Sequence, residues 1–318
     1  MKVLFLSPSD MVLEWLEGSL HAVNTGQLEI SVLRYDRIGT PVDRGMLDRI
    51  VRDKPDIVLY VSQADGPYVA APSTFRAIRA VVPLVHLCLD AGDIGFEPLL
   101  TKYRDEGCFT HTVACDGCAA GPVDNISFHP VDPRPYGNTM VQGHLDERAI
   151  SLGTCGGFPY GLRREVANTL SRDCGLYIKP REETFGSYGR YAQFLMSCRI
   201  VVDCALSAGG PEGKGPYART LKTRAVEVGL AGACLLELRG CALTKWAKED
   251  FDFCSYETAA EAVEKARWLM ANPDIAQAMA TNLALVVRRK MNPTIFWSQV
   301  FSACGLDAHF ANTIPTSP

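Results

Sequence analysis

Apolar and polar positions follow two recurrent patterns in the first half of the chain. Short apolar runs at 3–6, 28–35, 56–61 and 83–89 predict β-strands, and the run at 56–61 is continuous, as in parallel strands buried on both faces. Segments 11–23, 44–52 and 74–81 carry apolar residues at helical spacing. Two more short strands are predicted at 109–114 and 126–128. Strands that alternate with helices predict a parallel sheet with right-handed crossovers.

The second half of the chain repeats this alternation. Strands are predicted at 149–152, 175–178, 199–205 and 234–237, and helices at 163–173, 188–197, 220–230, 259–271, 275–289 and 294–304. Between the halves, residues 130–147 contain several prolines and glycines and little apolar periodicity, which is typical of a linker.

These patterns predict an α/β fold with two Rossmann-like domains and parallel sheets. We expect an N-terminal domain at 1–135, a linker at 136–147 and a C-terminal domain at 148–292. The last segment, 293–318, is expected to cross back to the N-terminal domain as a helix and a tail. Ligands of such sheets bind beyond the carboxyl ends of the strands, so a site in a central cleft is expected.

The composition disfavours nucleic-acid-binding, membrane-spanning and secreted proteins. The 318 residues are 47% hydrophobic, which is enough for two cores, and the formal net charge of −4 disfavours a nucleic-acid-binding face. There is no apolar run long enough to span a membrane, and the first apolar run is too short for a signal peptide. We therefore expect a cytoplasmic protein.

The 12 cysteines are scattered and are expected to be reduced thiols. Cys108, His111, Cys115 and Cys118 are residue types that bind zinc. Their spacing is unlike that of a zinc site, in which a long loop separates two ligand pairs. We expect no metal, and the role of this cluster stays open.

The candidate chemistry lies mainly in the second half. A glycine-rich loop at 207–215 leads into the helix predicted at 220–230, and a helix N-terminus favours a phosphate. Lys222 is expected in the first helical turn, where a cation is favourable only beside an anion, and Arg224 and Glu227 follow. The alternative is a solvated helix face.

A second glycine-rich turn follows the strand predicted at 149–152. Gly153 and Gly156 would allow a close approach of the backbone to phosphate, although such turns are common. Arg163 and Arg164 open the next helix, and two adjacent side chains on a helix cannot point the same way. Arg163 is the preferred diphosphate ligand, and the alternative is a solvated pair.

One stretch carries a family resemblance. Residues 221–227 read Leu-Lys-Thr-Arg-Ala-Val-Glu, and residues 232–237 read Gly-Ala-Cys-Leu-Leu-Glu. This pattern resembles the CgeB-like (spore-maturation protein) branch of the GT-B glycosyltransferases, with a C-terminal domain like that of retaining glycosyltransferase family four. The resemblance covers roughly 150–300, including the strand and turn at 251–257 and the two helices at 259–289. It is weaker over the N-terminal half.

The resemblance implies a role for each matching residue. Lys222 and Arg163 would neutralise the donor diphosphate, Glu227 would hold the ribose, and no metal would be needed. Two positions depart from the pattern. Val226 replaces an aromatic residue, and Arg219 stands where the broader family has a sugar-contacting glutamate. Glu212 could replace that carboxylate.

The acceptor side is expected in the N-terminal half. Asp90 and Asp93 follow the strand at 83–89, and the resemblance places an aspartate near Asp90. Ser9 and Asp10 lie on the first strand-to-helix loop. His86, inside the strand at 83–89, is a further acceptor-side candidate. Helix capping is the alternative for the first four residues, and a place in the core is the alternative for His86.

The sequence thus predicts a metal-independent glycosyltransferase with Asp90, Arg163 and Lys222 as catalytic residues. It would move a sugar, with retention of configuration, from a nucleoside-diphosphate-sugar co-substrate to an acceptor hydroxyl. The acceptor could be a small molecule, a glycan, a protein or a modified base, and a homodimer is left open. The alternatives are a GT-B-fold epimerase or phosphorylase and a non-catalytic nucleotide-sugar-binding protein.

Overall fold

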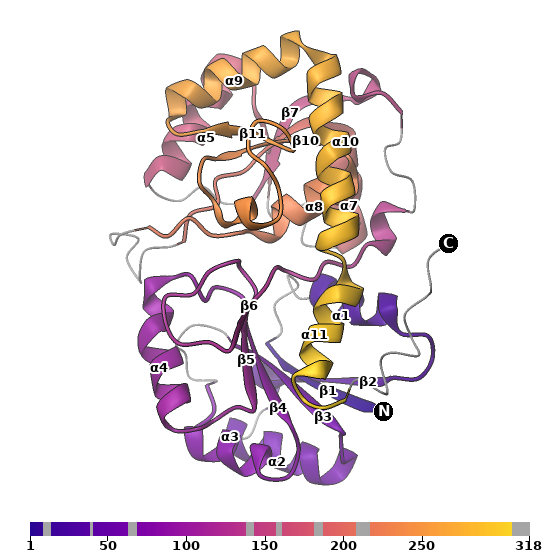
Figure 1. Cartoon of the computed structure of the whole chain (residues 1–318), viewed down its shortest axis with the longest axis vertical. Helices are drawn as coiled ribbons and strands as arrows, with labels where there is room; N and C mark the ends of the chain where they lie inside the picture. Colours follow the sequence, from indigo (N-terminus) through magenta and orange to yellow (C-terminus); the bar gives the residue numbers. More distant parts are fainter. Residues whose placement is uncertain are drawn as a thin grey trace. The chain divides into compact units, whose positions relative to one another are not determined.

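The computed structural model describes residues 1–8, 14–38, 41–62, 69–137, 143–156, 161–180, 187–207 and 217–306. They form two compact units (Figure 1). The first unit contains the described residues of Met1–Asp132 and Pro293–Pro318. The second contains those of Pro133–Ala208 and Glu212–Asn292.

The first unit is built on a parallel sheet of six strands in the order β2-β1-β3-β4-β5-β6. The strands are β1 (Lys2–Ser7), β2 (Glu29–Arg34), β3 (Ile57–Ser62), β4 (Leu84–Cys88), β5 (His111–Ala114) and β6 (Asn125–Ile126). Every residue of β3 and β4 is buried, as expected for central strands covered on both faces. The predicted parallel sheet is therefore confirmed for this half.

The helices of the first unit include one that the sequence patterns did not predict. They are α1 (Glu14–Val23), α2 (Val42–Asp53), α3 (Pro72–Arg79), α4 (Glu97–Asp105) and α11 (Pro293–Ser302), with the short 3-10 helices η2 (Tyr35–Arg37) and η3 (Ile94–Phe96). The unpredicted helix is α4, which buries only Leu100 and Tyr103 among its nine residues. So small a buried face gives too few apolar positions to reveal a helical period.

The second unit repeats the plan with a parallel sheet of five strands in the order β11-β10-β9-β7-β8. The strands are β7 (Ile150–Cys155), β8 (Tyr177–Lys179), β9 (Cys198–Val202), β10 (Cys234–Leu238) and β11 (Cys254–Tyr256). The helices are α5 (Gly161–Cys174), α7 (Tyr188–Ser197), α8 (Thr223–Ala231), α9 (Ala259–Ala271) and α10 (Pro273–Lys290), with the 3-10 helices η4 (Arg134–Tyr136), η5 (Leu145–Glu147) and η6 (Ala242–Lys245).

The boundary between the units falls at Asp132–Pro133, and the described residues of the segment 136–147, expected to be a linker, lie within the second unit. Buried apolar side chains explain why the described part of this segment belongs to the second unit. Tyr136 and Leu145 are buried, and the Leu145 amide donates to Gln277 Oε1 on α10 at 2.9 Å. Proline and glycine content alone did not distinguish a packed segment from a linker.

The last described helix, α11, belongs to the first unit. Trp297 is fully buried there, its ring packs edge-on against Phe5 of β1, and its Nε1 donates to Ser19 Oγ on α1 at 3.0 Å. Both the first strand and the last helix of the chain therefore build the same core.

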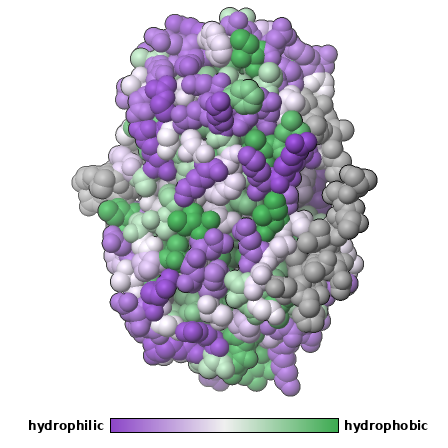
Figure 2. Space-filling model, viewed as in Figure 1, coloured by the Kyte–Doolittle hydropathy of each residue, from purple (hydrophilic) through white to green (hydrophobic). Residues whose placement is uncertain are grey.

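The described helices include none long and apolar enough to cross a membrane. On the face shown in Figure 2, hydrophilic residues cover most of the surface and hydrophobic residues show through in small, separate areas.

Candidate active site of the second unit

Three residues at the carboxyl end of the second sheet occupy neighbouring positions in one row. Leu236 of β10 pairs with Val202 of β9, so Glu237 stands opposite Asp203. Gly153 of β7 pairs with Val201, so the same register places Cys155 opposite Asp203 on the other side. Residues in register on parallel strands point to the same face of a sheet. The edge at which a ligand is expected thus carries two adjacent buried carboxyl groups.

Arg224 of α8 is held by this row. Its Nη1 donates to Asp203 Oδ1 at 2.6 Å, and its Nη2 donates to the Cys155 carbonyl at the end of β7. The Asp203 side chain is 1% exposed and that of Arg224 15%. Burial lowers the pKa of Arg224, but the charge of Asp203 outweighs this effect and raises it above its ordinary value. Arg224 therefore remains a cation and is hydrogen-bonded to the end of β7. The sequence predicted a direct contact of this residue with the donor.

Lys222 occupies the position that caps α8, immediately before the first turn. The sequence placed it inside the helix because the apolar pattern starts at Thr220. Thr220 instead lies outside the helix and is fully buried, and its amide donates to the Ala205 carbonyl at 2.8 Å. The helix consequently starts at Thr223, and the half-buried Lys222 lies beside its N-terminus.

Glu227 is also buried, at 3% exposure, one turn further along α8. Its Oε2 accepts a hydrogen bond of 2.9 Å from the Tyr191 hydroxyl on α7. Burial raises the pKa of Glu227 to about 7, although hydrogen bonds from Tyr191 and Tyr188 and the charge of Arg224 act in the opposite direction. The carboxyl group therefore changes charge near neutral pH.

Glu237 is fully buried and is tied to the backbone by one oxygen only. Its Oε1 accepts from the amides of Ala205 at 2.9 Å and Leu238 at 2.7 Å. Burial raises its pKa well above the ordinary value, and the negative charge of Asp203 raises it further. Among the described atoms, Glu237 Oε2 and Asp203 Oδ2 have no hydrogen-bond partner.

The glycine turn and the arginine pair lie on either side of residues 157–160, which are outside the described residues. Gly156 follows β7 with φ +88°, and a Cβ there would lie 3.1 Å from Arg224 Nη2, so glycine suits this turn. Arg163, in the first turn of α5, is half-buried near Cys204, whereas Arg164 is exposed, so the two diverge as expected.

Gly153 does not belong to the turn. It lies inside β7, where a Cβ would come within 2.6 Å of Cys198 Sγ and 3.4 Å of Phe194. The close packing of strand and helix explains this glycine. The sequence placed it in the turn because β7 extends beyond the strand predicted at 149–152.

Arg219, which the resemblance places at the position of a sugar-contacting glutamate, makes an ion pair. Its Nη1 donates to Glu257 Oε2 at 3.0 Å, its Nη2 contacts Glu257 Oε1, and it also donates to the Arg239 carbonyl. Glu212, the suggested replacement, lies outside the described residues.

In the first unit, His86, a candidate for the acceptor side, is a core residue, which is the alternative weighed for it. It is fully buried in β4 and stacks on Phe109 with ring centroids 4.7 Å apart, and burial lowers its pKa to about 3. Asp93 caps η3 by accepting from the Gly95 amide at 2.9 Å, which is the capping alternative. Asp90 is exposed just beyond β4.

Two other groups of candidates complete the predicted set. Ser9 and Asp10 lie outside the described residues. The thiols of Cys108, Cys115 and Cys118 point to the backbone carbonyls of Pro72, Val113 and Asp116, and His111 lies near Asp124. The part of the chain that the structure describes contains no group of three or more residues suited to a metal ion.

Sequence reasoning missed Asp203, Glu237 and Tyr191. The signal for the first two was a carboxyl group at or near the end of an apolar strand, at 199–205 and 234–237. Tyr191 carried no such signal because its contact with Glu227 depends on how α7 packs against α8.

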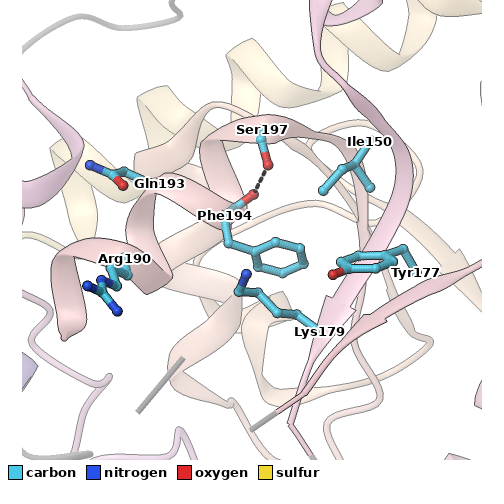
Figure 3. A pocket seen from close by; sticks show the side chains of 7 residues that line it. All are labelled: Ile150, Tyr177, Lys179, Arg190, Gln193, Phe194 and Ser197. Atoms are coloured by element: carbon cyan, nitrogen blue, oxygen red, sulfur yellow. Dashed lines mark hydrogen bonds between the residues drawn. The ribbon is translucent and has the colours of Figure 1, made fainter. Parts of the chain in front are cut away.

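A separate cavity of about 630 Å³ lies between β8 and α7 (Figure 3). Lys179 and Tyr177 reach from β8 toward Phe194 of α7, and Lys179 Nζ lies 5.5 Å from the centre of the Phe194 ring. The cavity is lined by Ile150, Tyr177, Lys179, Arg190, Gln193, Phe194 and Ser197. It contains none of the predicted site residues.

The comparisons with known proteins agree on the fold. Residues 169–294 match a family model described as glycosyl transferase-like. No curated protein matches the sequence. The structure is similar to that of HepE from Anabaena in complex with UDP, with a TM-score of 0.60 at 10% identity over 96% of this chain and 100% of that chain.

Two further structures are similar to the same extent. A glycosyltransferase from Rickettsia africae gives a TM-score of 0.60 at 10% identity over 99% of both chains. Sucrose-phosphate synthase from Thermosynechococcus elongatus gives 0.59 at 10% identity over 96% of this chain and 99% of that chain. The chain therefore has the GT-B fold, and its residues 169–294 are similar to the glycosyl transferase-like family model.

Proposed function

We propose that this protein transfers a sugar from a nucleoside-diphosphate-sugar to the hydroxyl group of an acceptor, with retention of anomeric configuration. The observation that carries the proposal is the family match at 169–294, which includes α8 with Lys222, Arg224 and Glu227. The CgeB-like branch remains our finer assignment of the family. The structures of HepE with UDP and with UDP-glucose support a UDP-sugar as donor.

Positive charge at the start of α8 supports the donor assignment. Lys222 lies beside the helix N-terminus, whose amides and dipole favour an anion. In the proposal, Lys222 and Arg163 stabilise the departing diphosphate, Glu227 binds the ribose, and Asp90 contacts the acceptor. Because these cations supply the compensating charge, no metal is required.

A non-catalytic nucleotide-sugar-binding protein is the second candidate, and one observation favours it. Arg219 and its ion pair with Glu257 occupy the place of a sugar-contacting carboxylate. Such a protein would bind the donor without turnover.

The test is a thermal-shift screen with UDP, GDP, ADP, CDP and dTDP on the wild type and Lys222→Ala. Lys102→Ala, on the exposed face of α4, serves as the matched control. A ligand that binds only the folded state raises Tm. At a ligand concentration of 100 times Kd, the free energy of unfolding increases by about 2.7 kcal/mol. We expect one nucleotide to raise the Tm of the wild type and of Lys102→Ala, and to do so far less for Lys222→Ala.

A turnover assay with the nucleoside-diphosphate-sugar that contains this nucleotide, with and without EDTA, then separates the candidates. Turnover that EDTA leaves unchanged supports the metal-independent transferase, and binding without turnover supports the second candidate. If no nucleoside diphosphate shifts the Tm, both fail.

A further inference from the structure

Two buried carboxyl groups lie at the carboxyl-terminal ends of β9 and β10 in the second sheet. Each has one oxygen to which the described residues offer no hydrogen-bond donor. Asp203 is 0% exposed and uses Oδ1 for Arg224, while Glu237 is 0% exposed and uses Oε1 for two backbone amides. Their other oxygens, Oδ2 and Oε2, have no hydrogen-bond partner within that part of the chain. Buried polar atoms of this kind require an explanation.

The register of the strands supplies the explanation. Asp203 directly follows β9, and the register that pairs Val202 with Leu236 places it opposite Glu237 of β10, so both side chains are expected on the same face. The charge of Asp203 acts on Glu237, in agreement with this arrangement. Two carboxylates in such positions repel each other, but a carboxyl group that keeps its proton can donate to the other. The charges then also balance, because Arg224 compensates Asp203 and a protonated Glu237 adds no charge.

We propose that Glu237 is a positioning residue of the donor site, which holds a proton on Oε2 and donates it to Asp203 Oδ2. The inference rests on the proposed function, because it concerns the site that would bind the diphosphate. Asp203, fixed through both oxygens, orients Arg224, which in turn holds the Cys155 carbonyl and the Gly156 turn. Glu237 thus acts on the site through its neighbours and without contact with substrate.

Other titratable groups that face Glu237 do not obscure its titration. Burial raises the pKa of Cys204 to about 12 and those of Cys241 and Tyr256 well above their ordinary values, so all three stay neutral up to pH 9. Arg224 stays charged. The groups around Glu237 are Asp203 and Cys204 from the end of β9, Arg224 from α8, Cys241 before η6 and Tyr256 from β11.

The sign of the pH effect follows from the direction of the shift. A carboxyl group whose pKa is raised in the folded protein stabilises the fold fully below its unfolded pKa and loses that contribution as pH rises toward the folded pKa. Glutamine in place of Glu237 has the same shape, can donate to Asp203 Oδ2 through its amide and does not ionise. Ionised Glu237 would also place a negative charge beneath the diphosphate.

The experiment measures Tm and the denaturant unfolding equilibrium from pH 5 to 9 for the wild type, Glu237→Gln and Glu264→Gln. Glu264 is an exposed residue of α9 and provides the matched control. We expect the stability of Glu237→Gln relative to the wild type to increase with pH, by up to about tenfold in the unfolding equilibrium constant per pH unit. Glu264→Gln should show no such trend. A difference independent of pH would overturn the proposal.

A second measurement addresses the site. At pH 7 we expect Glu237→Gln to bind the nucleotide with an affinity within about twofold of that of the wild type. Between pH 7 and pH 9 the variant should lose less affinity than the wild type. Asp203→Asn, which removes the charge that orients Arg224, should weaken binding by about tenfold or more, in line with about 1.4 kcal/mol per factor of ten.

The outcomes separate the two proposals. A tenfold loss of affinity in Glu237→Gln at pH 7 would overturn the protonated carboxyl, because glutamine reproduces it. The stability difference between Glu237→Gln and the wild type could increase with pH while neither of these two proteins binds any nucleoside diphosphate. In that case the proton on Glu237 stands, while the proposed function and the positioning role fail.

Discussion

At the scale of single residues, Glu227 combines an exposure of only 3% with a pKa raised to about 7. A carboxyl group with an ordinary pKa of 4.5 that titrates at about 7 makes folding less favourable as it ionises. Because the folded pKa is the higher one, its stabilising contribution is complete below about pH 4.5 and is lost as pH rises to about 7.

We predict that Glu227→Gln gains stability relative to the wild type over this range, by on the order of 3 kcal/mol. Urea unfolding at pH 5, 6, 7 and 8 measures the difference. Glu264→Gln is again the control, and equal slopes for all three proteins would show that Glu227 titrates normally.

Tyr191 provides an independent check of the same contact. Tyr191→Phe removes the hydroxyl that donates to Glu227 Oε2, so we expect a loss of about 1–3 kcal/mol at pH 8, where the carboxylate predominates. The loss should shrink in the Glu227→Gln background, because the buried charge is absent there. An equal loss in both backgrounds would place the effect outside this contact.

At the scale of elements, α8 is positioned by its fit against α10. Gly229 faces Val287, and a Cβ on Gly229 would come within 2.5 Å of Val287 Cγ2 and 3.3 Å of Leu283 Cγ. Valine has few rotamers, so it cannot easily move away. The glycine therefore sets how closely the helix that carries Lys222 and Glu227 approaches its neighbour.

We predict that Gly229→Ala destabilises the second unit by about 1–3 kcal/mol, despite the higher helix propensity of alanine. Val287→Ala should recover part of this loss in the double variant. The control is Gly189→Ala on α7, where the nearest atom to a new Cβ is Ser187 Oγ at 3.4 Å, and where we expect no loss. Chemical denaturation compares the wild type, the two single variants, the double variant and Gly189→Ala. Full additivity of Gly229→Ala and Val287→Ala would contradict direct contact.

Sequence patterns anticipated elements far better than contacts. The continuous apolar run at 56–61 predicted a buried strand, and every residue of β3 is buried. Helix α7 has the predicted bounds. The start of α8 moved by three residues because Thr220 finds a backbone partner in Ala205, which no local pattern reveals. The direction of Arg224, toward Asp203 and Cys155, depends on the register of three strands and was likewise hidden.

At the scale of the whole molecule, the last helix completes the core of the first unit. Trp297 is fully buried on α11 and contacts Phe5 of β1 and Ser19 of α1. We predict that Trp297→Ala costs about 3–5 kcal/mol in the first unit. Hydrogen exchange should show lower protection of β1, β3 and β4 and unchanged protection of β7, β9 and β10, whereas a uniform decrease would indicate that the two units unfold together.

The place of α11 has a consequence for how the chain acquires its structure during translation. The ribosome delivers every strand of the second unit before residues 293–302, whereas the first unit, although its synthesis starts earlier, must wait for that helix. We therefore expect the second unit to mature first, and the nascent first unit to keep the cavity for Trp297 open until then. In this protein the order of folding would reverse the order of synthesis.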